Sequence, residues 1–261
     1  MPSAIYIALM IGNSRYHWGL CQHTQLIHSC SSPYLSTPQI QQLIHQPTLN
    51  HFLTILNPPS FPTSSLPVPL FLASVVPKQT QLWLNYPHLR MISLADIPIA
   101  NMYPSLGIDR ALALFAATKS FGSPVLVIDA GTALTFSAVD AEQNFVGGAI
   151  LPGVGLQLTM LGNQTGQLPH IDLSSQLQSR WAMNTNDAIQ SGIIYTLLAG
   201  IKDFIENWRQ SFPDGKIVIT GGDTMILSNY LQTIYPQISE QILIEKNLVL
   251  QGICQVSHGL E

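Results

Sequence analysis

The feature of this sequence that most constrains its fold is an internal repeat of strand patterns. Residues 6–20 read as an apolar strand, a turn of glycine and small polar residues, and a returning strand, and residues 125–139 repeat that pattern. A third strand candidate follows each copy, at residues 25–31 and 144–150. Two such units half a chain apart predict an α/β fold of two duplicated lobes with a cleft between them.

The composition fits a globular protein with a sizeable core. Apolar residues make up 46% of the 261 residues and charged residues only 9%. The formal net charge is −4 and the sequence has no basic block, which argues against a nucleic-acid-binding face. Lys and Arg together number only 10, so a phosphate-binding site here must rely on metal ions and backbone N–H groups.

The expected organisation is a first lobe over residues 1–118 and a second lobe over residues 119–261, joined by a helix at residues 110–121. The N-terminal residues lack the basic region of a secretory signal. The best apolar run, residues 188–201, is interrupted and too short to span a membrane, and three cysteines do not make a disulfide framework. We therefore expect a soluble, cytoplasmic protein with no membrane partner.

Three glycine-marked turns are the first candidates for chemistry, because glycine lets the backbone approach a phosphate and small polar side chains supply donors. Each follows an apolar strand; the residues are Gly12, Asn13 and Ser14, then Asp129, Gly131, Thr132 and Thr135, and finally Gly221, Gly222 and Asp223. One such turn alone is an ordinary tight turn. Three of them, two in repeated positions, indicate phosphate binding.

A fourth element, residues 106–110, opens the connecting helix with the sequence Leu-Gly-Ile-Asp-Arg. Asp109 is either a helix N-cap or a group that accepts a proton from an attacking hydroxyl. Arg110 suits an anionic substrate group, and its charge should keep Asp109 ionised. The residues alone do not decide between the two readings.

Cys21, His23, His28 and Cys30 are symmetric about residues 24–27. In a hairpin that turns there, all four side chains share one face, as in a Cys2His2 zinc site. The spacing is atypical for zinc and flat hairpin positions converge poorly on one ion, so the favoured reading is a hairpin without metal.

Taken together and in order, these motifs resemble the type III pantothenate kinases. Gly12, Asn13 and Ser14 are similar to the first phosphate motif of that family, residues 106–110 to its Gly-x-Asp-Arg motif, and residues 129–135 to its second phosphate motif. Smaller matches extend over nearly the whole chain, whereas residues 31–69 resemble nothing specific in the family. The ordered set is more specific than any single motif.

The resemblance implies an actin-like fold of two ribonuclease-H-like lobes, usually a homodimer, that transfers phosphate from ATP to pantothenate in the first step of coenzyme A synthesis. It implies Asp109 as the proton acceptor and Asp129 at a potassium (K+) or ammonium (NH4+) site, with Mg2+ accompanying ATP. The implied pantothenate-binding residues are Tyr103, Gly107, Ile108, Asp109, Arg110 and Thr185. The implied ATP-binding residues are Gly12, Asn13, Ser14, Thr132, Thr135, Gly221 and Gly222.

Met10 departs from the family pattern, which has Asp at this place to organise Mg-ATP. The repeat shows the same gap, because aligning Gly12 with Gly131 puts Met10 opposite Asp129. Residues 1–20 contain no Asp or Glu that could replace the missing carboxylate, and methionine does not hold hydrated Mg2+. Two alternatives therefore stay open: a catalytically weakened regulatory relative, and an actin-like kinase for another small hydroxy or carboxylate acceptor.

Overall fold

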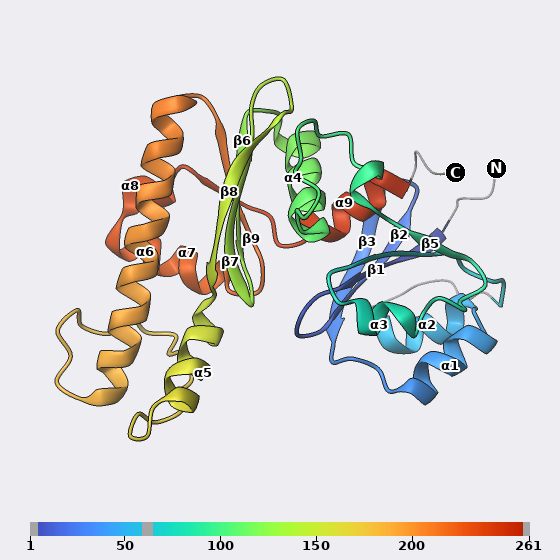
Figure 1. Ribbon diagram of the computed structural model, residues 1–261, viewed down its shortest axis with the longest axis horizontal. Helices are drawn as coiled ribbons and strands as arrows, with labels where there is room; N and C mark the ends of the chain where they lie inside the picture. Colours follow the sequence, from blue (N-terminus) through green and yellow to red (C-terminus); the bar gives the residue numbers. More distant parts are fainter. Residues whose placement is uncertain (1–4, 59–64, 258–261) are drawn as a thin grey trace. The chain divides into compact units, whose positions relative to one another are not determined.

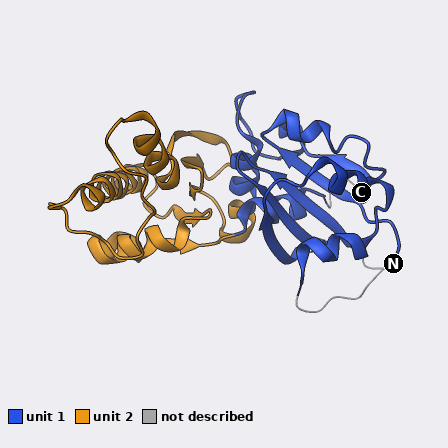
Figure 2. Cartoon of the chain, turned by 90° about the horizontal axis from the view of Figure 1, so that it is seen from below, with its two compact units in different colours: residues 1–116, 247–261 blue, residues 117–246 orange. Residues whose placement is uncertain are grey.

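The computed structural model describes residues 5–58 and 65–257. The chain forms two compact units (Figure 2): unit 1 comprises residues 1–116 and 247–261, and unit 2 comprises residues 117–246. Each unit is built around one five-stranded mixed sheet with helices on its faces.

The sheet of unit 1 has the strand order β3-β2-β1-β4-β5. Strands β1 and β2 and strands β2 and β3 pair antiparallel, whereas β4 and β5 continue the sheet in parallel. The strands are β1 (Ile5–Ile11), β2 (Tyr16–Gln22), β3 (Gln25–Ser32), β4 (Leu70–Ser74) and β5 (Leu89–Met91).

Helices cover both faces of this sheet (Figure 1), which explains why its central strands are apolar on both sides. One face packs Ile7, Leu9 and Ile11 against helices α1 and α2, and α9 covers the other face. The helices of unit 1 are α1 (Thr37–His45), α2 (Leu49–Leu56), α3 (Pro77–Gln81), the first part of α4 (Ile108–Phe121), α9 (Leu248–Ser257) and the 3-10 turn η1 (Leu94–Asp96).

Unit 2 repeats the topology of unit 1 with the strand order β8-β7-β6-β9-β10. Its first three strands again pair antiparallel, and the last two again continue in parallel. The strands are β6 (Val125–Ala130), β7 (Ala133–Val139), β8 (Phe145–Pro152), β9 (Lys216–Thr220) and β10 (Ile242–Ile244). The expected duplicated α/β fold is therefore confirmed.

The helices of unit 2 include one that is much longer than the others. They are α5 (Val154–Gln164), α6 (Thr185–Ser211), α7 (Thr224–Ile234) and α8 (Pro236–Ser239). Helix α6 has 27 residues and is long and apolar enough, by length and composition alone, to cross a membrane. Its buried residues, among them Leu197, Ile201 and Ile205, form the core of unit 2 with strands β6, β7 and β9, as expected for the central helix of a packed unit.

The C-terminal helix joins unit 1 rather than the second lobe to which the expected boundary at residues 118 and 119 assigned it. Helix α9 packs on strands β1 to β4. The hydroxyl of Tyr6 donates to the carbonyl oxygen of Cys254 over 3.0 Å, and the hydroxyl of Ser257 donates to that of Tyr6 over 2.5 Å. Polar bonds within an apolar interface fix the position of a helix on a sheet.

Two expectations about the cysteines are wrong. Cys21 forms a disulfide with Cys254, which links β2 to α9 across 233 residues of sequence. The β2–β3 hairpin turns at residues 23 and 24, and an irregularity after Leu20 brings Cys30 opposite Trp18.

The four side chains of the Cys2His2 alternative, which the sequence analysis disfavoured, therefore do not lie together. His28 Nε2 bonds to the carbonyl oxygen of Leu56 over 2.9 Å, and Cys30 packs against the core on the α2 side of the sheet. Throughout residues 5–58 and 65–257, no group of three His, Cys, Asp or Glu side chains is arranged to hold a metal ion.

Helices α1 and α2 occupy much of residues 31–69, where no family pattern was found. The end of α1 and the start of α2 place Leu43 and Phe52 in the core of unit 1. Residues 59–64 of this stretch lie outside the described residues.

Candidate active site

The first glycine turn (Gly12, Asn13 and Ser14) joins β1 to β2 in unit 1. The N–H of Gly12 donates to the carbonyl oxygen of Arg15 over 3.1 Å, which closes the turn. The hydroxyl of Tyr34 donates to the carbonyl oxygen of Gly12 over 2.5 Å. The backbone of the turn is thereby fixed, while Asn13 and Ser14 are exposed to a ligand.

Met10 lies two residues before this turn and is only 3% exposed. Across the strands, it pairs with His17 on β2 and with Ala73 on β4. The thioether therefore lies within the sheet face that also carries His17, and it offers no charge to a metal ion.

The acceptor cluster (Tyr103, Gly107, Ile108, Asp109 and Arg110) lies in unit 1 at the start of α4. Asp109 Oδ1 accepts a 2.8 Å hydrogen bond from the backbone N–H of Arg110, within the first turn of the helix. A side chain at residue 107 would overlap Asp109 Oδ1, so glycine is required for this position of the carboxylate. Ile108 is buried and anchors the helix start in the core.

The environment of Asp109 differs from the one expected from its neighbour alone. Burial raises the pKa of the Asp109 carboxyl, while the backbone N–H and the guanidinium of Arg110 act in the opposite direction. Desolvation therefore shifts the pKa of Asp109 upward in spite of the neighbouring charge of Arg110, an effect that the sequence neighbours alone do not indicate. A raised pKa makes Asp109 a better proton acceptor than a solvated aspartate.

Arg110 is a buried cation, with 6% of its surface exposed. Its Nη1 donates a 2.8 Å hydrogen bond to the hydroxyl oxygen of Tyr103, which is itself 41% exposed. The acceptor cluster therefore brings together Tyr103, Gly107, Asp109 and Arg110. Of these residues, Tyr103 was expected only from the resemblance to the family.

The second glycine turn (Gly131 and Thr132) joins β6 to β7 in unit 2, at the place that corresponds to the first. Asp129 pairs with Thr135 on β7 and with Thr220 on β9, so these oxygen-bearing side chains form one row on one sheet face. The carbonyl oxygen of Thr132 accepts a 2.9 Å bond from the N–H of Gly153, where α5 begins.

The third glycine turn (Gly221, Gly222 and Asp223) follows β9 and lies against the second. The N–H of Asp223 donates to the carbonyl oxygen of Ala130 over 2.8 Å. Gly221 has a φ of +97°, and a side chain there would overlap the carbonyl of Ala130. Burial raises the pKa of the Asp223 carboxyl. Unit 2 thus brings Asp129, Thr132 and Gly221 to the carboxyl ends of the neighbouring strands β6 and β9.

Thr185 is exposed at the first position of α6 in unit 2. The N-cap residue, Asn184, accepts a 3.0 Å bond from the N–H of Asp187 and donates a 2.7 Å bond to its carboxylate. This capping arrangement fixes the backbone that carries Thr185. Thr185 and the acceptor cluster belong to different units.

The donor atoms present suit some cations and not others. Asp129, Thr135 and Thr220 pair across three strands and carry only oxygen donors, which fit a hard cation. Beside the first glycine turn, position 10 carries the thioether of Met10 in place of a carboxylate, and this side chain does not fit the role of a Mg2+ ligand.

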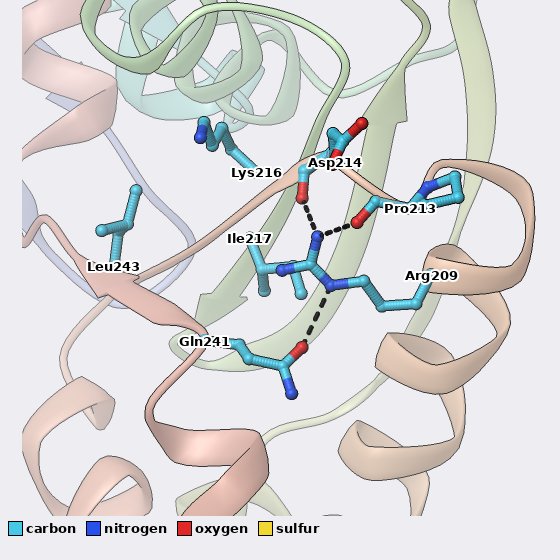
Figure 3. A pocket seen from close by; sticks show the side chains of 8 residues that line it. Arg209, Pro213, Asp214, Lys216, Ile217, Gln241 and Leu243 are labelled. Atoms are coloured by element: carbon cyan, nitrogen blue, oxygen red, sulfur yellow. Dashed lines mark hydrogen bonds between the residues drawn. The ribbon is translucent and has the colours of Figure 1, made fainter.

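A surface hollow of about 300 Å3 lies at the opposite end of β9 from the third glycine turn (Figure 3). Arg209 is one of the residues that line this hollow. The guanidinium of Arg209 donates hydrogen bonds to the carbonyl oxygens of Pro213 and Gly215 and to the side chain of Gln241. Arg209 therefore holds the loop before β9 in place, and the hollow is separate from the candidate site.

Sequence reasoning missed two residues that help to form these turns, His17 and Tyr34. His17 had a signal, because a residue seven positions after Met10 on a returning strand faces it across a four-residue turn. Tyr34 reaches the first glycine turn from a distant part of the sequence, and no local pattern indicates such a contact.

Comparison with known proteins gives one family. The model of the family described as type III pantothenate kinase matches residues 6–207. The type III pantothenate kinase of Nostoc sp. is 51% identical over 265 residues, which cover 98% of this chain and 95% of the relative. The type III pantothenate kinase of Synechocystis sp. is 39% identical, over 97% of this chain and 91% of the relative.

Solved structures agree with this chain in fold. A Baf family protein from Campylobacter jejuni has a TM-score of 0.62 at 20% identity, over 97% of this chain and 98% of that one. The activator of 2-hydroxyisocaproyl-CoA dehydratase from Clostridium difficile, solved with ADPNP, has a TM-score of 0.53 at 10% identity, over 98% and 93% of the two chains. These likenesses agree with the duplicated α/β fold described above.

Proposed function

The chain belongs to the type III pantothenate kinase family, and we propose that it phosphorylates pantothenate with ATP, with Asp109 as the proton acceptor, as the first step of coenzyme A biosynthesis. The observation that carries the role of Asp109 is its position in the acceptor cluster. A partly buried carboxylate, fixed by the Arg110 N–H and by the absence of a side chain at Gly107, lies beside a buried cation.

Asp109 orients the primary hydroxyl of pantothenate toward the γ-phosphorus of ATP. The oxygen of that hydroxyl forms the new P–O bond, the bond to the β–γ bridging oxygen breaks, and the hydroxyl proton passes to Asp109. Because phosphoryl transfer has a loose transition state, the main tasks of the protein are alignment and neutralisation of charge.

Arg110 binds the carboxylate of pantothenate, and the Tyr103 hydroxyl holds the guanidinium in place. The 2.8 Å bond between Nη1 and the Tyr103 oxygen supports this assignment, because a cation with one donor fixed is pre-organised for an anion. Gly107, Ile108 and Thr185 complete the pantothenate-binding residues of the proposal.

The first and second glycine turns, with Thr135, Gly221 and Gly222, bind the phosphates of ATP. Backbone N–H groups in such turns form anion-binding concavities, which suits a chain poor in Lys and Arg. When Mg2+ is bound with ATP, it neutralises part of the negative charge of the triphosphate. Asp129, with the Thr135 and Thr220 hydroxyls in its row, holds K+ or NH4+.

The enzyme acts in the cytoplasm and as a homodimer in this proposal, on the strength of the family alone. Met10 is the observation that favours the alternative of a catalytically weakened regulatory relative, because it removes the carboxylate expected to organise Mg-ATP.

Coupled detection of ADP release by the purified protein, with Mg-ATP and pantothenate, tests the proposal. We expect turnover that requires pantothenate and increases with K+ or NH4+ but not with Na+. Turnover with acetate or a hexose in place of pantothenate would support the alternative acceptor. A folded protein without turnover under any of these cations would favour the regulatory relative.

A further inference from the structure

Position 10 is the place where the first glycine turn lacks the charge that its counterpart in unit 2 has. Met10 occupies the position of Asp129, and it is 3% exposed. The side chains around it must therefore provide any further polar contact to a phosphate bound at this turn.

His17 is the polar neighbour of Met10 on the same sheet face. The two residues pair across β1 and β2, and Ser31 pairs with His17 across β2 and β3. Met10, His17 and Ser31 thus form one row of side chains that crosses three strands.

The His17 ring has a fixed orientation within that row. Its Nδ1 lies 2.9 Å from Ser31 Oγ, within hydrogen-bond distance. A methyl group on residue 12 would lie 3.5 Å from His17 Nε2, so this nitrogen lies next to the first glycine turn. The ring therefore uses one nitrogen to hold its position and turns the other toward the turn.

The charge state of the ring follows from its surroundings. Burial lowers the pKa of His17, and the nearby positive charge of Arg15 lowers it further. The ring is then neutral near pH 7, with one nitrogen as donor and the other as acceptor. If the Ser31 hydroxyl donates to Nδ1, Nε2 carries the proton and is a donor.

We propose that His17 binds ATP by donating a hydrogen bond from Nε2 to a phosphate oxygen at the first glycine turn. The assignment rests on the proposed ATP-binding role of that turn. His17 transfers no proton and forms no bond to phosphorus, so it is a binding residue for the nucleotide. A neutral donor beside Met10 also avoids the repulsion that a carboxylate there would exert on the phosphates unless a metal ion lay between them.

Titration calorimetry with Mg2+ and a non-hydrolysable ATP analogue tests the inference in the full-length protein. His17→Leu keeps an apolar side chain of similar size and removes the donor, so we expect affinity to fall by about 10- to 100-fold, as for a hydrogen bond to a charged group. His17→Gln offers an amide N–H and should bind within about threefold of the wild type. Ser31→Ala should give an intermediate loss, because it removes only the partner of Nδ1.

The control is His45→Leu, since His45 is an exposed histidine of α1 whose ring bonds to the carbonyl oxygen of Gln41. It should leave affinity unchanged. Unchanged affinity in His17→Leu, or equal losses in His17→Leu and His17→Gln, would overturn the inference. If His17→Leu does not fold, the order wild type, His17→Gln, Ser31→Ala remains the test, and full affinity in Ser31→Ala contradicts the proposed orientation.

Kinetics separate this inference from the proposed function. In an active enzyme, His17→Leu should raise the KM for ATP and leave the KM for pantothenate within about twofold. The affinities of the wild type and the variants for the ATP analogue can follow the expected order while the wild type never phosphorylates pantothenate. In that case the proposed function is wrong and the contact between His17 and the nucleotide is supported.

Discussion

Arg110 Nη1 donates a hydrogen bond to the Tyr103 hydroxyl oxygen over 2.8 Å. The arginine is buried, whereas the tyrosine is 41% exposed, so a surface residue fixes a cation at the start of α4. In our account this pair presents a guanidinium of fixed direction to the carboxylate of pantothenate.

Removal of the hydroxyl in Tyr103→Phe should therefore weaken pantothenate binding. We expect the KM for pantothenate to rise by about 3- to 10-fold, the size of one lost hydrogen bond, with little change in the KM for ATP. Steady-state kinetics with each substrate varied provides the measurement. Arg110→Ala should raise the pantothenate KM further, and an unchanged value in that variant would reject its role.

Gly107→Ala should impair turnover without removing a functional group. A side chain at residue 107 overlaps Asp109 Oδ1, so the carboxylate must move away from the position in which it is fixed. Displacement of a proton acceptor by about 1 Å is expected to lower kcat by about 100-fold. Gly155→Ala is a matched control, because a methyl group on Gly155 meets no atom within 4 Å. Equal kcat values in the two variants would contradict the account.

The acid limb of the pH profile should reflect the raised pKa of Asp109. Burial moves this pKa above the usual 3.8, and the acceptor must be ionised to work. kcat/KM should therefore fall as the pH drops through a midpoint above 3.8. The effect on stability has the opposite sense: the folded state favours the protonated carboxyl, so this contribution is complete below the unfolded pKa and is lost as the pH rises through the folded pKa.

Asp223 provides the control for that profile, because burial raises its pKa too. Asp223→Asn should retain the acid limb of the wild type if Asp109 causes it. Disappearance of the limb in Asp223→Asn would assign the titration to the third glycine turn instead.

The Cys21–Cys254 disulfide should stabilise unit 1 in the oxidised protein. It closes a loop of 233 residues, and a long closed loop restricts the unfolded chain, so we expect a contribution of about 2–5 kcal/mol. Urea unfolding with and without a reductant measures it. The double variant Cys21→Ser and Cys254→Ser should unfold at the reduced midpoint under both conditions, whereas Cys30→Ser should keep the difference. If the urea midpoint of the wild type is the same with and without the reductant, the assigned disulfide between Cys21 and Cys254 is contradicted.

The fold and the motifs were predictable from the sequence because their signals are local. The repeat of residues 6–20 and 125–139 predicted the two lobes, since strand period and turn composition depend on neighbouring residues. The helix at the end of the chain was also expected, but its attachment to unit 1 was not. A packing partner 233 residues away, such as Cys21 for Cys254, leaves no local pattern.

The sequence shows that Asp109 and Arg110 are neighbours at a predicted helix start, but it does not show how deeply they are buried. The neighbouring Arg110 predicted that Asp109 stays ionised, and the structure adds that burial of the helix start raises the pKa of this carboxyl. The expected pairing of Cys21 with Cys30 across the β2–β3 hairpin is also wrong. An irregularity after Leu20 and a turn at His23 shift the register and separate the two cysteines. A shift of one residue moves a side chain to the other face of a sheet.

The most direct test of the central claim is pantothenate-dependent ADP release by the wild type and by Asp109→Asn, assayed together with Mg-ATP and K+. Asparagine keeps the shape of the side chain and cannot accept the proton, so kcat should fall by about 100- to 10,000-fold while the variant stays folded and binds both substrates. Turnover in Asp109→Asn at the wild-type rate would contradict the assignment of Asp109 as the proton acceptor.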